Sequence, residues 1–314
     1  MIQINALSEK HLEEASQLVA IRYKALQAGL PVLPSQEKML EDLPSELKEL
    51  LSEVGGAVAL SNNRVLGFIT GLVIPEFLGR RSFYSPDWAN GAVLGESRRI
   101  YEALYTGLSG QLVDNGCLLH AVSVFSHDQL GNDAWKWLGF GLSAVDGIRE
   151  VSLIDDNQGD LKIKQATLEE IQEVTSFDRA LGQHLADAPT FWIHEYHDYS
   201  EWMKETGNIA WLAYLENEVV GFIAFEPGNS CECMFLRDEK TINITGAFTL
   251  EQFRNKGIST AILNHVMEWA KQAGYLRCAV DFEAMNVLAS RFWLKYFEPV
   301  SYSWIRWIDE SLRR

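Results

Sequence analysis

The chain contains two copies of one sequence pattern, and this internal repeat constrains its fold more than any other feature. Residues 63–69 (NRVLGFI) match residues 217–223 (NEVVGFI), and residues 116–122 (GCLLHAV) match residues 274–280 (GYLRCAV). Two further matches keep the same order, at offsets of about 154 to 160 residues: residues 2–15 with 161–174, and Asn132 with Asn286. Because four ordered matches are improbable by chance, the sequence predicts two copies of one domain.

The two predicted domains span residues 1–155 and 160–314, and the polar stretch IDDNQGD at 154–160 joins them. In each copy the pattern indicates a strand, one or two helices, a hairpin, a fourth strand, a long helix, a strand, a shorter helix and a final strand. The hairpins turn at Asn62-Asn63 and at residues 216–218, between runs rich in alternating apolar residues. The helices after the first strands are expected at residues 8–27, 35–53 and 167–204. This order predicts an α/β (α+β) fold in which each domain has a mixed, mostly antiparallel twisted sheet flanked by helices.

Composition limits the class of protein. The chain has 314 residues, of which 47% are hydrophobic and 22% charged, and this is long enough for two domains. No apolar run approaches the roughly 20 residues that a membrane helix needs, and the first residues lack a signal-peptide pattern. Four cysteines do not make a disulfide framework, and Cys231 and Cys233 lack the second pair that a zinc site needs. The sequence therefore predicts a cytoplasmic protein with reduced thiols and no membrane association.

The charge balance bears on the binding partner. With 43 acidic and 27 basic residues, the net charge is −16. A nucleic-acid partner is not expected, because neutralising phosphates requires a basic surface. An acidic surface favours a cationic substrate such as an amine, although it also serves solubility alone.

Residues 253–260 (FRNKGIST) place a basic, glycine-containing loop between a predicted strand and a predicted helix. Upstream, residues 241–250 alternate and are rich in β-branched side chains. Downstream, from residue 258, apolar residues recur at helical spacing. Since a helix N-terminus carries unpaired N–H groups and a partial positive charge, this loop predicts an anion site. An ordinary helix start is the alternative.

Four motifs make the second copy resemble the GNAT (GCN5-related) family of N-acetyltransferases, and the first copy resembles it more loosely. Residues 254–259 (RNKGIS) resemble the family's acyl-CoA pyrophosphate loop, with Ser259 in place of its last glycine or alanine. Gly274 resembles the end of the family's following helix. Residues 286–293 (NVLASRFW) resemble the stretch beside the coenzyme, and residues 297–300 (FEPV) resemble the motif after it, without its glycine.

This resemblance implies an acyl-CoA site in the second copy, with acetyl-CoA as the co-substrate and no metal. The loop N–H groups would bind the pyrophosphate. The preceding strand would pair its backbone with the pantetheine arm and would separate from the next strand to leave a slot for the thioester. The implied coenzyme residues are Phe248, Thr249, Leu250, Arg254, Asn255, Lys256, Gly257, Ile258, Ser259, Thr260, Asn286, Ala289 and Trp293.

The catalytic residues are marked less clearly. In the family a backbone N–H polarises the thioester carbonyl, and a tyrosine protonates the departing thiolate. The resemblance puts Trp293 at the position of that tyrosine, and an indole does not serve as such an acid. Tyr296, one turn later, is therefore the candidate acid, with a packed core aromatic as the alternative. Asp281 is the candidate base, and the alternatives are Glu226, Glu283 or a chain of water molecules.

Residues 184–202 (HLADAPTFWIHEYHDYSEW) are open to three interpretations. A metal site is the least favoured, because no HExxH or similar spacing is present. The resemblance places the stretch over the acceptor pocket, where its aromatic side chains would be walls, and core packing is the third interpretation. The possible ligands are His184, Asp187, His194, His197 and Asp198, and the possible walls are Trp192, Tyr196, Tyr199 and Trp202.

The first copy departs from the second at the anion loop. Arg99 stands where the second copy has Gly257, and Tyr101 stands where it has Ser259. A side chain thus fills each position that must be small for a phosphate to approach. The first copy is therefore predicted to be a degenerate GNAT-like domain without coenzyme.

The sequence as a whole predicts an acyl-CoA-dependent N-acyltransferase, an N-acetyltransferase whose acceptor is a small-molecule or peptidyl amine. One alternative is a sensor or scaffold that binds acyl-CoA with little turnover, and Trp293 favours it. A second alternative is an aminoacyl transferase that uses charged tRNA, and the acidic balance argues against it. The acceptor, the acyl chain length and the oligomeric state are not assigned by the sequence.

Overall fold

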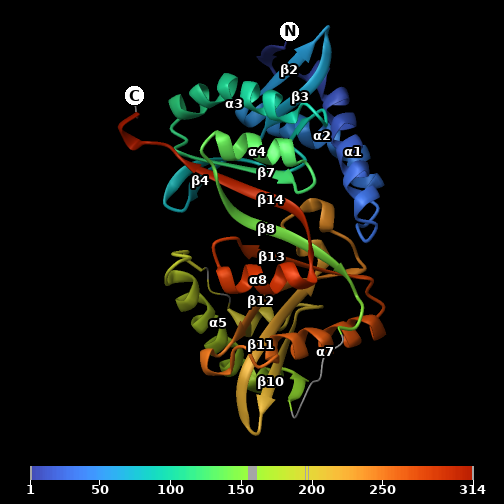
Figure 1. Ribbon diagram of the computed structural model, residues 1–314, viewed down its shortest axis with the longest axis vertical. Coiled ribbons are helices and arrows are strands. Elements are labelled where there is room, and N and C mark those ends of the chain that lie inside the picture. The colour runs from blue at the N-terminus through green and yellow to red at the C-terminus, as the bar shows by residue number, and fades with distance from the viewer. Residues whose placement is uncertain (1, 155–160, 195, 197, 313–314) are drawn as a thin grey trace. The chain divides into compact units, whose positions relative to one another are not determined.

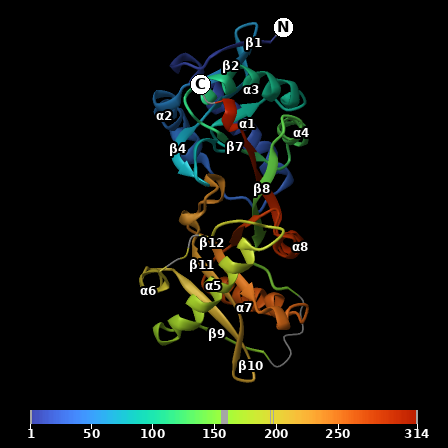
Figure 2. The same ribbon diagram turned by 90° about the vertical axis from the view of Figure 1, so that its left-hand side faces the viewer.

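The computed structural model describes residues 2–154, 161–194, 196 and 198–312, and Figures 1 and 2 show it from two sides. The chain forms two compact units. The first unit comprises Met1–Asp146 together with Pro299–Arg314, and the second comprises Gly147–Glu298. Residues 155–160, which hold most of the predicted linker, lie outside the described residues.

The second unit is built on a mixed sheet with the strand order β13-β12-β11-β10-β9. β12 and β13 are parallel and the other neighbours are antiparallel. The sheet is therefore mixed and mostly antiparallel, as the sequence predicted. The expected hairpin around residues 216–218 is formed by β10 and β11. The strands are β9 (Lys162–Gln165), β10 (Ile209–Leu215), β11 (Glu218–Pro227), β12 (Thr241–Thr249) and β13 (Arg277–Glu283).

Helices cover both faces of this sheet. The helices are α5 (Ile171–Ala186), α6 (Tyr199–Trp202), α7 (Ile258–Gln272) and α8 (Val287–Tyr296), with 3₁₀ turns at Leu168–Glu170, Gly228–Ser230, Met234–Leu236 and Glu251–Phe253. Leu212 of β10 belongs to a core cluster with Phe177 of α5. The next side chain back, Trp211, packs on His265 of α7 with ring centroids 4.9 Å apart. Because successive side chains of a strand point to opposite faces, α5 and α7 lie on opposite faces of the sheet (Figure 2).

The helical region predicted at 167–204 is interrupted. α5 ends at Ala186, and the next helix begins only at Tyr199. Pro189 lies in the interval, and proline lacks the N–H that a continuing helix would require. The described residues of the interval, which exclude Glu195 and His197, therefore form a loop, and His194 in this loop contacts Asp178 of α5.

β12 and β13 separate part of the way along their length. The last residue pair between them is Ile244 with Val280, whereas β12 continues to pair with β11 as far as Thr249. The separation begins at a bulge, since the partner of Ile244 is Phe225 and the partner of the next paired residue, Gly246, is Ala224. A bulge bends a strand and ends regular pairing. From Gly246 onward the edge of β12 that faces β13 has no strand partner among the described residues, which is the slot that the resemblance implied.

The first unit repeats this architecture. β5 pairs in parallel with β7, as β12 does with β13, and β6 pairs antiparallel with β3, as the end of β12 does with β11. Its strands are β1 (Gln3–Ala6), β2 (Gly56–Ser61), β3 (Arg64–Thr70), β4 (Leu72–Phe77), β5 (Arg80–Ser85), β6 (Asn90–Ala92), β7 (Leu119–Phe125) and most of β8 (Gly141–Glu150). Its helices are α1 (Leu12–Gly29), α2 (Glu37–Val54), α3 (Ser97–Asp114) and α4 (Gln129–Trp137), with 3₁₀ turns at Glu9–His11 and Glu310–Leu312. The predicted fold class, two tandem domains with mixed sheets and flanking helices, is confirmed.

The last strand of the chain belongs to the first unit. β14 (Glu298–Trp307) pairs antiparallel with β7, from Ser301 opposite Phe125 to Trp307 opposite Leu119. The compact units therefore differ from the predicted segments 1–155 and 160–314. The physical reason is the continuous ladder of seven residue pairs, which commits β14 to the sheet of the first unit.

In the first unit, side chains of the chain itself fill the slot beside β6. Asn90 occupies the place that Ala247 has in the second unit, because each pairs with the corresponding isoleucine of the neighbouring strand. Its amide Nδ2 donates to the carbonyl oxygens of Pro86, at 2.8 Å, and of Ser123 on β7, at 2.9 Å. Tyr101 donates its hydroxyl hydrogen to Asn90 Oδ1, at 2.9 Å. This region of the first unit is thus closed by buried hydrogen bonds.

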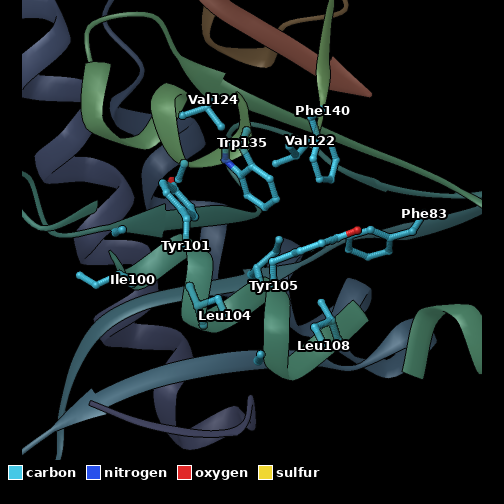
Figure 3. Packing of buried hydrophobic residues seen from close by; sticks show 14 of the residues in the cluster. Phe83, Ile100, Tyr101, Leu104, Tyr105, Leu108, Val122, Val124, Trp135 and Phe140 are labelled. Atoms are coloured by element: carbon cyan, nitrogen blue, oxygen red, sulfur yellow. The ribbon is translucent and has the colours of Figure 1, made fainter. Parts of the chain in front are cut away.

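The anion loop of the second unit is replaced by a helix in the first. α3 begins at Ser97, so Arg99 and Tyr101 lie within its first turns. Arg99 forms a surface ion pair with Glu96, and Tyr101 is fully buried against Trp135 of α4, with ring centroids 5.4 Å apart. Figure 3 shows these two rings within the aromatic core of the first unit. A packed core therefore stands where the second unit has a loop.

A buried ion pair lies at the start of α3. Arg22 Nη1 contacts Asp128 Oδ2 at 2.8 Å and donates to the carbonyl oxygen of Ala92 at 2.7 Å. The other carboxylate oxygen of Asp128 accepts from the Ser97 hydroxyl, at 2.6 Å, and from the N–H of Gly131, at 2.9 Å, which caps α4. Because both charged side chains are buried, loss of either partner would leave an uncompensated charge and destabilise the folded first unit.

No helix in the described part of the chain combines the length and the apolar character needed to cross a lipid bilayer.

Candidate active site

The second unit contains a cavity of about 200 Å³ beside the slot of β12. Its walls come from α5, β11, β12, the loop before α7 and the first turns of α8. Predicted coenzyme residues that line it are Phe248, Thr249, Arg254, Asn255, Ser259, Asn286, Ala289 and Trp293. The other lining residues are Leu181, His184, Phe222, Ile223, Ala247, Leu288 and Phe292.

The loop before α7 has the geometry of an anion site. Gly257 is the N-cap of α7 and has φ 78° and ψ 2°, in the left-handed region that side chains disfavour. The first helical residues, from Ile258 to Thr260, have no acceptor for their N–H groups within the helix. Ser259 Oγ lies 2.8 Å from Thr249 Oγ1, so the loop is tied to the end of β12. The unpaired N–H groups at the start of α7 and the side-chain-free Gly257 therefore lie together at the end of the slot.

Arg254 brings a permanent positive charge to the cavity wall. Its Nε donates to the carbonyl oxygen of Thr249 at 3.2 Å, and its guanidinium carbon lies 5.1 Å from the centroid of the Phe248 ring. The neighbouring Lys256 packs instead over Phe253, with its Nζ 5.0 Å from that ring centroid. Of the two basic residues in the loop, Arg254 is the one that lines the cavity.

Five predicted coenzyme residues do not line the cavity with their side chains: Leu250, Lys256, Gly257, Ile258 and Thr260. They lie in or next to the loop that borders it, where a role through backbone N–H groups stays a prediction. Thr260 is turned toward α8, with its Oγ1 3.0 Å from the hydroxyl of Tyr296.

Asn286 forms the N-terminus of α8 and contacts α5. Its Oδ1 accepts from the N–H of Ala289 at 3.3 Å, which caps the helix. The same oxygen lies 3.4 Å from Nε2 of His184 on α5. The ring of His184 also packs near Phe248, with centroids 6.0 Å apart. α5, β12 and α8 therefore meet at His184.

The structure places Trp293 in the cavity and Tyr296 outside its lining. Trp293 is 6% exposed and lines the wall. The hydroxyl of Tyr296 instead contacts Thr260 Oγ1, and it accepts from Lys295 Nζ at 2.9 Å. Tyr296, the predicted acid, therefore does not line the cavity.

Asp281 lies where β13 leaves β12, since it follows Val280, the last paired residue. Asp281 is exposed to solvent, but the protein atoms around its carboxylate still desolvate it in part, and this desolvation raises the pKa of Asp281. The nearby carboxylates Glu283, Glu232 and Glu226 raise it further, to about 7. Asp281 is not part of the cavity lining, but it is placed at the fork of the slot.

Of the four aromatic side chains considered as walls in the stretch at 184–202, two are buried, Trp192 is half-buried and Tyr196 is 61% exposed. Tyr199 and Trp202 are buried, and Trp202 Nε1 donates to Glu226 Oε1 at 2.6 Å. His194 Nε2 lies 2.8 Å from the buried carboxylate of Asp178. The described residues contain no group of three side chains arranged to hold a metal ion, and His197 lies outside them. Among the candidates from this stretch that the structure describes, His184 alone lines the cavity.

The part played by His184 was missed by the sequence interpretation, which considered it only as a metal ligand. No spacing rule relates His184 to Asn286, which lies 102 residues later. The one available signal is its place in the last turn of a helix that the resemblance sets over the site.

Comparisons with known proteins agree with this geometry. Residues 177–297, which lie within the second unit, match the model of the acetyltransferase (GNAT) family. Streptothricin acetyltransferase A from Bacillus subtilis (strain 168) is 27% identical over 95 residues, which cover 30% of this chain and half the length of that relative.

Two solved structures share the fold at low identity. A GCN5-related N-acetyltransferase from Sphaerobacter thermophilus has a TM-score of 0.56 at 10% identity, over 98% of this chain and 95% of that one. A GCN5-related glucosamine N-acetyltransferase region of a fungal β-N-acetylglucosaminidase has a TM-score of 0.51 at 13% identity, over 97% of this chain and 38% of that one. The matched residues, the slot and the loop identify the second unit as an acetyltransferase (GNAT) domain, and the first unit repeats its architecture.

Proposed function

We propose that the chain is an acyl-CoA-dependent N-acyltransferase that moves an acetyl group from acetyl-CoA to a primary amine. The observation that carries this proposal is the unpaired edge of β12, which opens into a cavity ending at the glycine-containing loop of α7. An extended, amide-rich arm fits such an edge because it can pair with the backbone as a strand would.

The parts of the co-substrate would be bound by different groups. The pyrophosphate would accept hydrogen bonds from the N–H groups at the start of α7, with Arg254 supplying charge. The pantetheine arm would lie along β12 between Gly246 and Thr249, and Asn286 would border it from α8. A backbone N–H on the unpaired edge of β12 would stabilise the negative charge that develops on the thioester oxygen.

Asp281 is the proposed base that removes the proton from the acceptor amine. A pKa of about 7 leaves a large ionised fraction at neutral pH and still favours proton uptake. Its place at the fork brings it next to the point where the thioester carbonyl would lie. The neighbouring Glu226, Glu232 and Glu283 would also favour an acceptor that arrives as a cation.

The experiment that tests this function measures the release of CoA thiol from acetyl-CoA over a panel of amines. The panel includes a streptothricin and glucosamine, because the names of two similar proteins contain them. Amine-dependent thiol release supports the proposal. Tight CoA binding without release from any amine would instead support an acyl-CoA sensor, the alternative that Trp293 favours.

One CoA is expected to bind per chain, in the second unit. In the first unit Tyr101 and Asn90 fill the corresponding region with buried hydrogen bonds, and α3 replaces the loop. Isothermal calorimetry should therefore give a stoichiometry near one. A value near two would contradict the assignment of the first unit as a domain without coenzyme.

Replacing Asp281 with asparagine is expected to lower kcat/KM by roughly 100- to 10,000-fold, the usual effect of losing general base catalysis. In the native chain kcat/KM should rise with pH through about pH 7, because the base works in its ionised form and the pKa of Asp281 is raised to about 7. Asp281→Asn should lose this rise. Asp309→Asn, a matched change at an exposed residue of the first unit, should keep it. A rise that persists in Asp281→Asn would assign the base to another group.

A further inference from the structure

The cavity of the second unit has one histidine among the described residues that line it. Among the described residues that line it, His184 and Arg254 are the ionisable ones. Arginine keeps its proton at any working pH, and the hydroxyls of Thr249 and Ser259 do not ionise in that range. Within the described part of the lining, proton transfer therefore falls to His184.

The contact with Asn286 defines which nitrogen of His184 exchanges the proton. Asn286 Oδ1 accepts from the N–H of Ala289, which identifies the atom as the amide oxygen rather than the amide nitrogen. Since this oxygen cannot donate, Nε2 of His184, 3.4 Å away, carries a hydrogen and points it at Asn286. Nδ1 is then the ring nitrogen that gains and loses a proton.

In the family that the second copy resembles, a tyrosine protonates the departing thiolate, and no tyrosine of α8 lines the cavity here. The indole of Trp293 lines the cavity but carries an N–H that does not ionise. The hydroxyl of Tyr296 lies outside the lining, in contact with Thr260 and Lys295. His184 reaches the cavity from α5, on the side where the ring of Phe248 borders the edge of β12.

We propose that His184 is the general acid that protonates the departing CoA thiolate, an inference that rests on the proposed acyl transfer. An acceptor that arrives as a cation first gives one proton to solvent. The neutral amine nitrogen then bonds to the carbonyl carbon of the thioester, the carbon–sulfur bond breaks, and its electron pair goes to sulfur. The Nδ1 proton of the His184 imidazolium passes to that sulfur. The surplus proton on the amine nitrogen passes to Asp281, and solvent then returns His184 and Asp281 to their starting forms.

The test compares two matched histidine substitutions in the full chain. His184→Gln retains an N–H that can donate to Asn286 and removes the exchangeable proton. With an amine that the native chain acetylates, kcat should fall by roughly 100- to 10,000-fold, whereas the calorimetric Kd for CoA should keep its native value. His265→Gln makes the same change on α7, where the ring packs on Trp211 outside the cavity, and should keep the native kcat. Added imidazole should restore part of kcat to His184→Ala.

Each other outcome overturns the proposal. Native kcat in His184→Gln removes His184 from the chemistry, and a loss of CoA affinity with intact kcat makes it a binding residue instead. A loss of kcat in Tyr296→Phe together with native kcat in His184→Gln assigns the acid to Tyr296. A native chain that releases no thiol with any amine overturns the acyl transfer itself, so the two failures are distinguishable.

Discussion

Replacing Gly257 with glutamate is expected to abolish CoA binding while the chain remains folded. Gly257 has φ 78° at the N-cap of α7, where a side chain adds backbone strain of about 1–3 kcal/mol. The new carboxylate would also stand at the N–H groups that are proposed to bind the pyrophosphate and would repel it. Loss of charge-assisted hydrogen bonds worth about 1.5–3 kcal/mol each corresponds to an affinity loss of at least about 100-fold.

A matched control is available at the other end of the same helix. Gly274 also has a positive φ, 90°, and a Cβ there would meet no atom within 4 Å. Gly274→Glu therefore introduces the same charge and comparable strain away from the cavity, and it should keep the native Kd for CoA. Circular dichroism would check that both variants are folded. Equal affinities in the two variants would remove the loop of α7 from the proposed site.

Replacing Asp128 with alanine is expected to destabilise the first unit by about 3–5 kcal/mol, because it leaves Arg22 buried without its carboxylate. The change also removes the cap of α4, which is worth about 1 kcal/mol. Urea unfolding followed by tryptophan fluorescence measures the effect. Since two units need not unfold together, the transition of the first unit is the one to compare.

The control for this prediction is Glu102→Ala, which breaks a surface ion pair with Arg98 on α3. Surface pairs are worth about 1 kcal/mol at most, so this variant should unfold close to the native chain. Similar destabilisation by Asp128→Ala and Glu102→Ala would show that the buried pair contributes no more than the exposed one.

Local patterns in the sequence predicted the elements that depend on local physics. The hairpin turning at Asn62-Asn63 follows from turn residues that accept positive φ, which both asparagines adopt. The loop at 253–260 and the helix after it follow from a glycine and from apolar residues at helical spacing. The four ordered matches between the two copies predicted that both halves share an architecture, and the strand pairing confirms it.

Residues whose roles depend on tertiary packing were not predictable in this way. Tyr296 and Trp293 lie within one turn of the same helix, and only the packing of α8 against α7 decides which of them faces the cavity. His184 meets Asn286 only because tertiary packing brings α5 next to the start of α8, 102 residues later in the sequence. The strand partner of β14 was not predictable either, because its alternating pattern suits the sheet of either copy.

The commitment of β14 to the sheet of the first unit has a consequence for the order of events during synthesis. As the ribosome extends the chain from its N-terminus, the segment up to Asp146 is translated early but lacks the strand that pairs with β7. That strand emerges only after all of Gly147–Glu298 has been made. The half made first is therefore the half completed last, and until then β7 exposes a row of backbone donors and acceptors that a nascent chain must keep from other partners.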